Sequence, residues 1–354
     1  MQKLMIILRD ITENGGGERV CANLVNAFLE SFKVEVEIVS FYRLNPAPFY
    51  KILPQAQITY LSSSTILTKN KVKKFWNKTL YRLYLSYKAM KYIKKSHATI
   101  VLANDGVFIP FSKIKNINLL RIWHIKIPKK KKRIFDRFKT IIVLSSRNLA
   151  QWQHYHNNVK VIPNFLPIMP SIQTQYDKKR ILAAGRMSTE KGFDRLINTY
   201  AMIAKEIPDW ELVIAGDGIL KHELQAQIEF LGLQEYIKLL PFTQDMESLY
   251  LSASICVMSS YTEGFSMVLL EAGSYGLPCV SFDIEAGPKD IIEDSKSGYL
   301  IPDNDCELYA KKLKALVDDK NLRETMGQSA REIVKKKFGK ESIMLLWKEV
   351  LFCQ

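Results

Sequence analysis

The strongest constraint on this chain is the alternation of short apolar runs with longer amphipathic stretches from end to end. Apolar runs of four to eight residues are typical of strands buried on both faces, and helix-length connections between them are typical of parallel sheets. Strands are expected at residues 3–8, 35–40, 99–103, 119–123, 140–144, 159–164, 180–185, 210–216, 237–240, 255–259 and 278–282. The pattern therefore predicts doubly wound α/β architecture, with ligands bound at the carboxyl ends of the strands.

The number of domains follows from length and polarity. A chain of 354 residues with 47% hydrophobic residues is too long for one ordinary domain and can bury two cores. The polar run at 171–179 is an expected linker. The predicted domains are 1–170 and 176–337, followed by an amphipathic stretch at 338–354 that packs back across the first domain.

The cysteines and the N-terminus restrict the class of protein. Five widely separated cysteines include no C-x-x-C pair, so neither a disulfide framework nor a zinc site is expected. The apolar run at residues 4–8 is too short for a secretory signal or a membrane span, and no other segment has about 18 uninterrupted apolar residues. A soluble or peripheral cytoplasmic protein is predicted.

The strongest motif is the segment 261–272, which places Glu263 and Glu271 eight residues apart after a predicted strand. Gly264 is expected to open a helix whose first free amides can bind an anion such as phosphate. These amides belong to Phe265, Ser266 and Met267. Glu271 lies about two turns deeper, roughly 10 Å along the axis. One carboxylate can then contact a sugar while the other accepts hydrogen bonds from ribose. Without the preceding strand and the glycine turn, two glutamates at this spacing would be interpreted as a solvated charge pair.

Two glycine-containing turns follow other predicted strands. In residues 185–192, Arg186 and Lys191 can both reach a diphosphate, whose growing negative charge needs either a metal or fixed cations. In residues 14–19, Gly16 and Gly17 allow close approach of a ligand to a helix N-terminus. Neither turn is G-x-G-x-x-G, and Ser40 ends the second strand where dinucleotide binding requires an acidic residue, so a NAD enzyme is disfavoured.

Together these motifs resemble those of glycosyltransferase family 4. Supporting matches are residues 161–164, 215–218, 287–292 and 298–301. The resemblance implies the GT-B fold: two Rossmann-like doubly wound domains facing across a cleft, with a C-terminal helix packing back on the first domain. It also implies retention at the anomeric carbon, with no metal.

The resemblance assigns expected roles along the chain. Arg186 and Lys191 would hold the diphosphate, with Gly16 and Gly17 bordering it, and Glu271 would hold the ribose. Glu263 and the amides after it would position the sugar and phosphates. Residues expected near the base are Gly216, Gly218 and Phe242. The leaving phosphate oxygen would accept the acceptor's proton, so that no separate general base is needed.

Three further features leave alternatives open. Asp303 and Asp305 have Asp-x-Asp spacing but are interpreted as a solvated turn rather than a metal site. His124 follows a predicted strand where family members often contact the donor sugar, although a packed or surface histidine is nearly as consistent with the sequence. For Asp105 the turn interpretation of Asn-Asp-Gly is preferred over a substrate contact.

Charged residues are distributed unequally between the two halves of the chain. Residues 1–175 hold 29 Lys and Arg against 8 Asp and Glu, whereas 176–354 hold 22 against 28. A basic stretch with aromatic residues at roughly helical spacing, at 69–95, predicts a membrane-surface element, and a second basic run follows at 126–139. The surface residues predicted are Lys73, Lys74, Trp76, Lys91, Lys94, Lys130 and Lys131. A core helix with a solvated basic face is the alternative, and no nucleic-acid-binding module is recognisable.

The leading hypothesis is transfer of a hexose or N-acetylhexosamine from a UDP-sugar to a lipid-linked or lipopolysaccharide-type glycan, forming an α-linkage. The protein would lie on the inner face of the cytoplasmic membrane and contribute to cell-surface polysaccharide synthesis, capsule included. A sugar-nucleotide epimerase of the same fold and a non-catalytic basic nucleotide- or nucleic-acid-binding protein are the alternatives.

Overall fold

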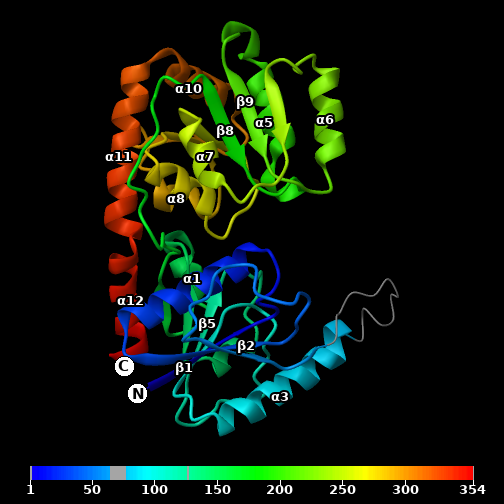
Figure 1. Ribbon diagram of the computed structural model, residues 1–354, viewed down its shortest axis with the longest axis vertical. Helices are drawn as coiled ribbons and strands as arrows, with labels where there is room; N and C mark the ends of the chain where they lie inside the picture. The colour runs from blue at the N-terminus through cyan, green and yellow to red at the C-terminus, as the bar shows by residue number, and fades with distance from the viewer. Residues whose placement is uncertain (1, 64–76, 126, 354) are drawn as a thin grey trace. The chain divides into compact units, whose positions relative to one another are not determined.

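A computed structural model describes residues 2–63, 77–125 and 127–353 (Figure 1). The chain forms two compact units: residues 1–163 with 343–354, and residues 164–342. Residues 164–170, assigned from the sequence to the first domain, therefore belong to the second unit. The physical reason is local pairing, because the Leu166 amide donates a 3.0 Å hydrogen bond to the Phe338 carbonyl.

The first unit is built on a seven-stranded parallel sheet of order β3-β2-β1-β4-β5-β6-β7. Its strands are β1 (Gln2–Leu8), β2 (Val34–Ser40), β3 (Gln57–Tyr60), β4 (Ile100–Ala103), β5 (Asn118–Trp123), β6 (Thr140–Val143) and β7 (Val159–Val161). Its helices are α1 (Gly16–Ser31), a π-helical turn (Asn77–Tyr81), α3 (Arg82–Lys95), short 3₁₀ turns (Phe135–Arg137, Ser146–Asn148), α4 (Leu149–Gln153) and most of α12 (Lys340–Phe352). Strand order reverses between β1 and β4, where doubly wound sheets bind ligands.

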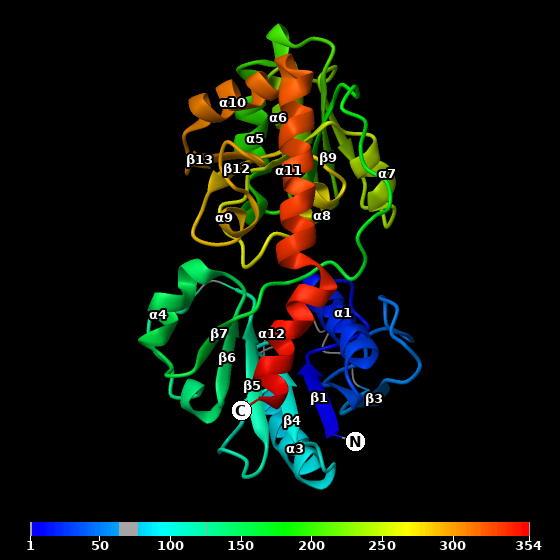
Figure 2. The same cartoon turned by 90° about the vertical axis from the view of Figure 1, so that its left-hand side faces the viewer.

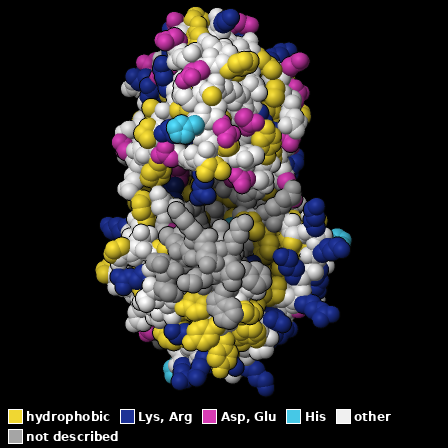
Figure 3. Space-filling model, turned by 90° about the vertical axis from the view of Figure 1, so that its right-hand side faces the viewer, with side chains coloured by type: hydrophobic (Ala, Val, Ile, Leu, Met, Phe, Trp, Pro, Cys, Tyr) yellow, Lys and Arg dark blue, Asp and Glu magenta, His cyan; other side chains and the backbone are white. Residues whose placement is uncertain are grey.

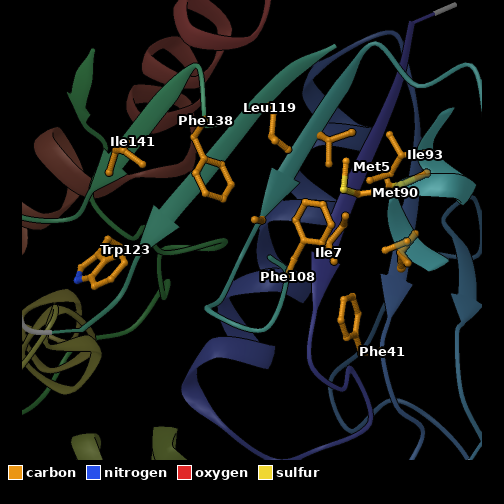
Figure 4. Packing of buried hydrophobic residues seen from close by; sticks show 14 of the residues in the cluster. Met5, Ile7, Phe41, Met90, Ile93, Phe108, Leu119, Trp123, Phe138 and Ile141 are labelled. Atoms are coloured by element: carbon orange, nitrogen blue, oxygen red, sulfur yellow. The ribbon is translucent and has the colours of Figure 1, made fainter. Parts of the chain in front are cut away.

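Helices cover both faces of this sheet. Met5 and Ile7 of β1 point to the same side as Phe108, Leu119 and the inner face of α3 (Figure 4). On another side of the unit, α12 lies beside α1, with Phe28 and Trp347 in edge-to-face contact at 5.3 Å (Figure 2). The expected packing of the C-terminal helix on the first domain is thus present.

The second unit has a six-stranded parallel sheet of order β10-β9-β8-β11-β12-β13. Its strands are β8 (Arg180–Ala184), β9 (Glu211–Ala215), β10 (Ile237–Leu240), β11 (Ile255–Met258), β12 (Cys279–Asp283) and β13 (Gly298–Pro302). Its helices are η4 (Thr189–Lys191, 3₁₀), α5 (Phe193–Ala201), η5 (Ala204–Glu206, 3₁₀), α6 (Lys221–Phe230), α7 (Met246–Leu251), α8 (Met267–Ser274), α9 (Pro288–Ile291), α10 (Cys306–Asp318) and α11 (Lys320–Phe338). Helix α5 contacts α6 and α10, and α8 contacts α9 and α11. The switch point lies between β8 and β11, and therefore between the two loops that carry Lys191 and Glu263.

The expected linker is fixed to the second unit. Thr174 and Tyr176 are buried, and the Arg331 guanidinium donates to the carbonyl of Pro170 at 2.6 Å. Among the described residues, no helix is long and apolar enough to cross a bilayer.

Candidate active site

The loop after β8 presents the Lys191 ammonium to a carboxylate. Lys191 ends the short helix η4, and Gly192 follows with φ +60°, a left-handed conformation that glycine adopts readily. The Lys191 Nζ lies 2.6 Å from Glu263 Oε1, which also accepts a 2.7 Å hydrogen bond from the Ser260 hydroxyl. Lys191 and Glu263 therefore contact each other directly, although they are 72 positions apart in the sequence. Both were assigned to donor binding from the sequence.

The loops after β8 and β11 are joined by further hydrogen bonds. The Tyr261 amide donates to the Glu190 carbonyl at 2.9 Å, and the Ser259 hydroxyl donates to the Lys191 carbonyl at 3.1 Å. The geometry of each loop therefore depends on the other.

Helix α8 begins at Met267, three residues later than expected. Ser266 is its N-cap and accepts a hydrogen bond from the Leu269 amide at 3.4 Å, so the prediction that Gly264 opens the helix is wrong. The Phe265 ring is buried and packs against Phe338 with centroids 5.7 Å apart. Anion binding by the amides of 265–267 stays a prediction.

Glu271 occupies a protected position in α8. Its side chain is nearly buried, with a relative exposure of 6%. The buried Tyr250 hydroxyl of α7 donates to Glu271 Oε2 at 2.9 Å, and the Tyr250 ring stacks on Tyr275 at 5.3 Å. A carboxylate oriented in this way can accept hydrogen bonds from a diol such as ribose.

The glycines after β9 have a packing role. A Cβ on Gly216 would lie 1.9 Å from the Gly185 carbonyl oxygen, and one on Gly218 would lie 2.2 Å from the Met187 carbonyl oxygen. Both glycines are therefore required by contact with the loop that carries the exposed Arg186. Contact of Gly216, Gly218 or Phe242 with a nucleotide base remains a prediction.

The Asp-x-Asp segment has defined structural contacts. Asp305 caps α10 by accepting from the Leu308 amide at 3.0 Å. Asp303 Oδ1 lies 2.7 Å from the Nη1 atom of the buried Arg195. The segment is thus a capped, ion-paired turn rather than a freely solvated one. Among the described residues, no group of three or more His, Cys, Asp or Glu side chains could hold a metal.

The first unit carries the predicted glycines at the start of α1. A Cβ on Gly16 or Gly17 would meet no atom within 4 Å, so packing within the chain does not require glycine there. The Gly17 carbonyl accepts a 3.0 Å hydrogen bond from the Asn104 side chain. Open space at a helix N-terminus is compatible with the predicted approach of a ligand.

His124 and Asp105 lie near the carboxyl ends of β5 and β4. His124 Nε2 is 3.3 Å from Asn104 Oδ1. Burial lowers the pKa of His124 to about 4, so the imidazole is neutral near pH 7. The Asp105 carboxylate accepts from the amides of Arg9 at 2.6 Å and Val107 at 2.8 Å, which supports its role as a turn residue, and burial raises its pKa.

The predicted basic surface is only partly within the described structure. Lys73, Lys74 and Trp76 lie outside the described residues, whereas Lys91, Lys94 and Lys130 are exposed. Lys131 pairs with Asp136 at 2.8 Å, which reduces the charge it can offer to a membrane.

Sequence reasoning missed three residues beside this site: Arg195, Tyr250 and Ser260. Each contacts the site through residues that are distant in the sequence, so no local sequence pattern indicates it. Arg195, for example, lies opposite the apolar stripe of α5 and is buried by loops from β11 and β13.

The chain is similar to known glycosyltransferases in sequence and in fold. Residues 166–333 match the family model described as glycosyl transferases group 1. The amylovoran biosynthesis glycosyltransferase AmsD of Erwinia amylovora is 26% identical over 99% of this chain and 100% of its own length. A Campylobacter jejuni α-1,4-N-acetyl-D-galactosaminyltransferase, named for a diphosphoundecaprenol-linked glycan, is 25% identical over 94% and 93%. A solved structure of S. aureus TarM containing UDP has a TM-score of 0.81, with 17% identity and 99% coverage of both chains.

Proposed function

We propose that this chain, which is a glycosyltransferase with the GT-B fold, transfers a hexose or N-acetylhexosamine from a UDP-sugar. The product is an α-glycoside formed with retention, as the motif resemblance to family 4 implies. The proposed acceptor is a lipid-linked or lipopolysaccharide-type glycan of the bacterial cell surface. Two relatives support this class of acceptor: AmsD is a glycosyltransferase of amylovoran biosynthesis, and the C. jejuni enzyme is named for a glycan linked to diphosphoundecaprenol.

The observation that carries the proposal is the Lys191–Glu263 contact at the switch point of the second sheet. It combines a cation suited to a diphosphate with a carboxylate suited to sugar hydroxyls. The buried Glu271, the fifth residue of α8, adds an acceptor for hydroxyl groups in the same unit.

The chemistry follows from where charge develops. As the sugar–phosphate bond breaks, negative charge grows on the leaving diphosphate, and fixed donors stabilise that charge because they need no reorganisation. We assign this role to Lys191 and Arg186, without a metal. The leaving phosphate oxygen accepts the acceptor's proton, Glu263 positions the sugar, and the neutral His124 is proposed to contact it.

A membrane-facing element is part of the proposal. Successive exposed positions of α3 change from aromatic to basic: Tyr84 and Tyr87 are 57% and 58% exposed, and Lys91, Lys94 and Lys95 follow on the exposed side. Figure 3 shows hydrophobic side chains gathered on one face of the first unit, with Lys and Arg nearby. Aromatic anchors with lysines suit an anionic leaflet, where each lysine contributes about 1 kcal/mol.

Donor and acceptor assays test the transfer. Thermal-shift screening of sugar nucleotides is followed by measurement of UDP release with and without glycolipid acceptors. We expect release that depends on acceptor, and its loss in the Lys191→Ala and Glu271→Ala variants. Lys314→Ala, which removes a partly buried lysine paired with Asp318 on α10, serves as the matched control and should retain activity. Full activity of both site variants would refute the assignment.

Vesicle binding tests the membrane element separately. Charge reversal in the double variant Lys91→Glu/Lys94→Glu should weaken sedimentation with vesicles of anionic phospholipid. Lys335→Glu/Lys336→Glu makes the same charge change on α11, at exposed positions of the second unit. Equal loss in both double variants, or no loss in the first, contradicts a specific role for α3.

A further inference from the structure

We propose that Arg195, with Asp303 as its counter-ion, is a positioning residue that fixes the loop carrying Glu263. The inference rests on the proposed roles of Glu263 and Lys191 in transfer. Arg195 itself is buried on α5 behind the loop, so its effect is transmitted through residues that contact it.

The Arg195 guanidinium is bonded to two consecutive carbonyls just after β11. Its Nε donates to the Ser259 carbonyl at 2.6 Å, and its Nη2 donates to the Ser260 carbonyl at 2.5 Å. Nη1 donates to Asp303 Oδ1 at 2.7 Å and to Asn304 Oδ1 at 3.0 Å. A planar fork of donors therefore joins the loop after β11 to the turn after β13.

Aromatic rings fix the plane of this fork. The Arg195 Cζ lies 4.0 Å from the ring centroid of Tyr261 and 4.0 Å from that of Phe282. The residue is only 5% exposed, so its charge needs a partner within the protein, and Asp303 supplies it. Lysine has a single ammonium and cannot reproduce this flat, multiply bonded contact.

The two serines transmit this constraint to the site. Ser260 accepts from Arg195 through its carbonyl and donates from its hydroxyl to Glu263 Oε1 at 2.7 Å. Ser259 accepts from Arg195 in the same way, and its hydroxyl donates to the Lys191 carbonyl at 3.1 Å. Displacement of the Arg195 fork therefore shifts both members of the Lys191–Glu263 pair.

This arrangement also explains the structural role of Asp303. Its carboxylate, spaced from Asp305 as in a metal-binding motif, neutralises a buried arginine. The turn between them contains Asn304 in a left-handed conformation, with φ +68°. That conformation places the Asn304 amide oxygen where it, too, accepts from Arg195.

The test is a double-mutant cycle on acceptor-dependent transfer. Arg195→Lys should reduce kcat/KM about 10- to 100-fold, because small misplacements of positioning groups have effects of this size. In a Glu263→Gln background the same substitution should have a smaller effect, because the part transmitted through Glu263 is already lost and only the part transmitted through Lys191 remains. Independent, multiplicative losses in the double variant would overturn the proposal.

Arg323→Lys is the matched control. Arg323 is also buried, donates to the carbonyls of Tyr176, Leu316 and Val317, and lies over the Trp210 ring at 5.0 Å, but it is bonded to the linker and α10. Its replacement should lower stability while leaving kcat/KM of the folded enzyme near wild type. A loss equal to that of Arg195→Lys would show a general effect of removing a buried arginine.

Hydrogen–deuterium exchange of the ligand-free protein tests the positioning role of Arg195 without an activity measurement. Arg195→Lys and the milder Asp303→Asn should both accelerate amide exchange in residues 259–263, and Arg323→Lys should not. Unchanged exchange in both variants would refute the positioning role. If the wild-type protein transfers no sugar from any UDP-sugar, the proposed function fails, and the exchange result still decides whether Arg195 fixes this loop.

Discussion

Gly192→Ala tests how tightly the two loops of the site are packed. Gly192 has φ +60°, and a Cβ built there lies 2.3 Å from the Ser259 carbonyl oxygen and 3.1 Å from Arg195 Nε. The Ser259 carbonyl cannot withdraw freely because it accepts the hydrogen bond from Arg195. The substitution should therefore destabilise the second unit and move the loop that carries Glu263.

The expected magnitude has two parts. Holding alanine in the left-handed region costs about 1–2 kcal/mol, and forcing a methyl group into a filled space costs about 1–3 kcal/mol more. The sum is about 2–5 kcal/mol in the free energy of unfolding of this unit. Gly232→Ala isolates the first part, because Gly232 has φ +67° and a Cβ there meets nothing within 4 Å.

Native-state hydrogen exchange of β8 and β11 amides, measured across a urea series, reports the unfolding free energy of this unit alone. Gly192→Ala should lose at least 1 kcal/mol more than Gly232→Ala, and its kcat/KM should fall, whereas Gly232→Ala should retain transfer. Equal destabilisation by the two substitutions would refute the steric argument.

Three other perturbations address separate parts of the molecule. Tyr250→Phe removes a donor to the buried Glu271 and should lower the unfolding free energy of the second unit by about 1.5–3 kcal/mol; an unchanged thermal midpoint would contradict this. Trp347→Ala removes a buried side chain of α12 and should cost the first unit about 3–5 kcal/mol, measured by urea unfolding. Burial lowers the pKa of His124 to about 4, so below the unfolded value of about 6.5 the unfolded chain binds a proton that the folded one excludes. Its contribution to stability should fall by about 1–3 kcal/mol from pH 7 to pH 4, and the difference between wild type and His124→Gln should follow that fall.

The sheets were largely predictable because buried parallel strands leave continuous apolar runs. The segment at 255–259 is a clear case, and β11 occupies Ile255–Met258. The edge strand β3 was missed because Gln57–Tyr60 is only partly buried and contains no such run. β13 was noted only as a motif, since Gly298 and Pro302 at its ends resemble a turn.

The candidate site was predictable only as separate motifs. Glycine turns and charged residues after strands marked Lys191 and Glu263 as candidates, because both follow strand ends, and Glu271 was marked by its place in the helix that comes next. Their partners depend on tertiary packing: Tyr250 reaches Glu271 from 21 residues away, and Arg195 reaches Ser259 from 64. The start of α8 was misplaced because Gly264 resembles a helix boundary, while Ser266 provides the actual cap.

The Lys191–Glu263 contact has a consequence for discrimination among anions. With Glu263 as its partner, the Lys191 ammonium is already neutralised before any ligand arrives, and the carboxylate repels incoming negative charge. A lone chloride or phosphate ion gains little by exchanging with a carboxylate held 2.6 Å away. A ligand that brings hydroxyl groups to Glu263 together with phosphate for Lys191 satisfies both sides at once. Under the roles proposed for Lys191 and Glu263, the pair would therefore favour a sugar joined to a phosphate over either group alone.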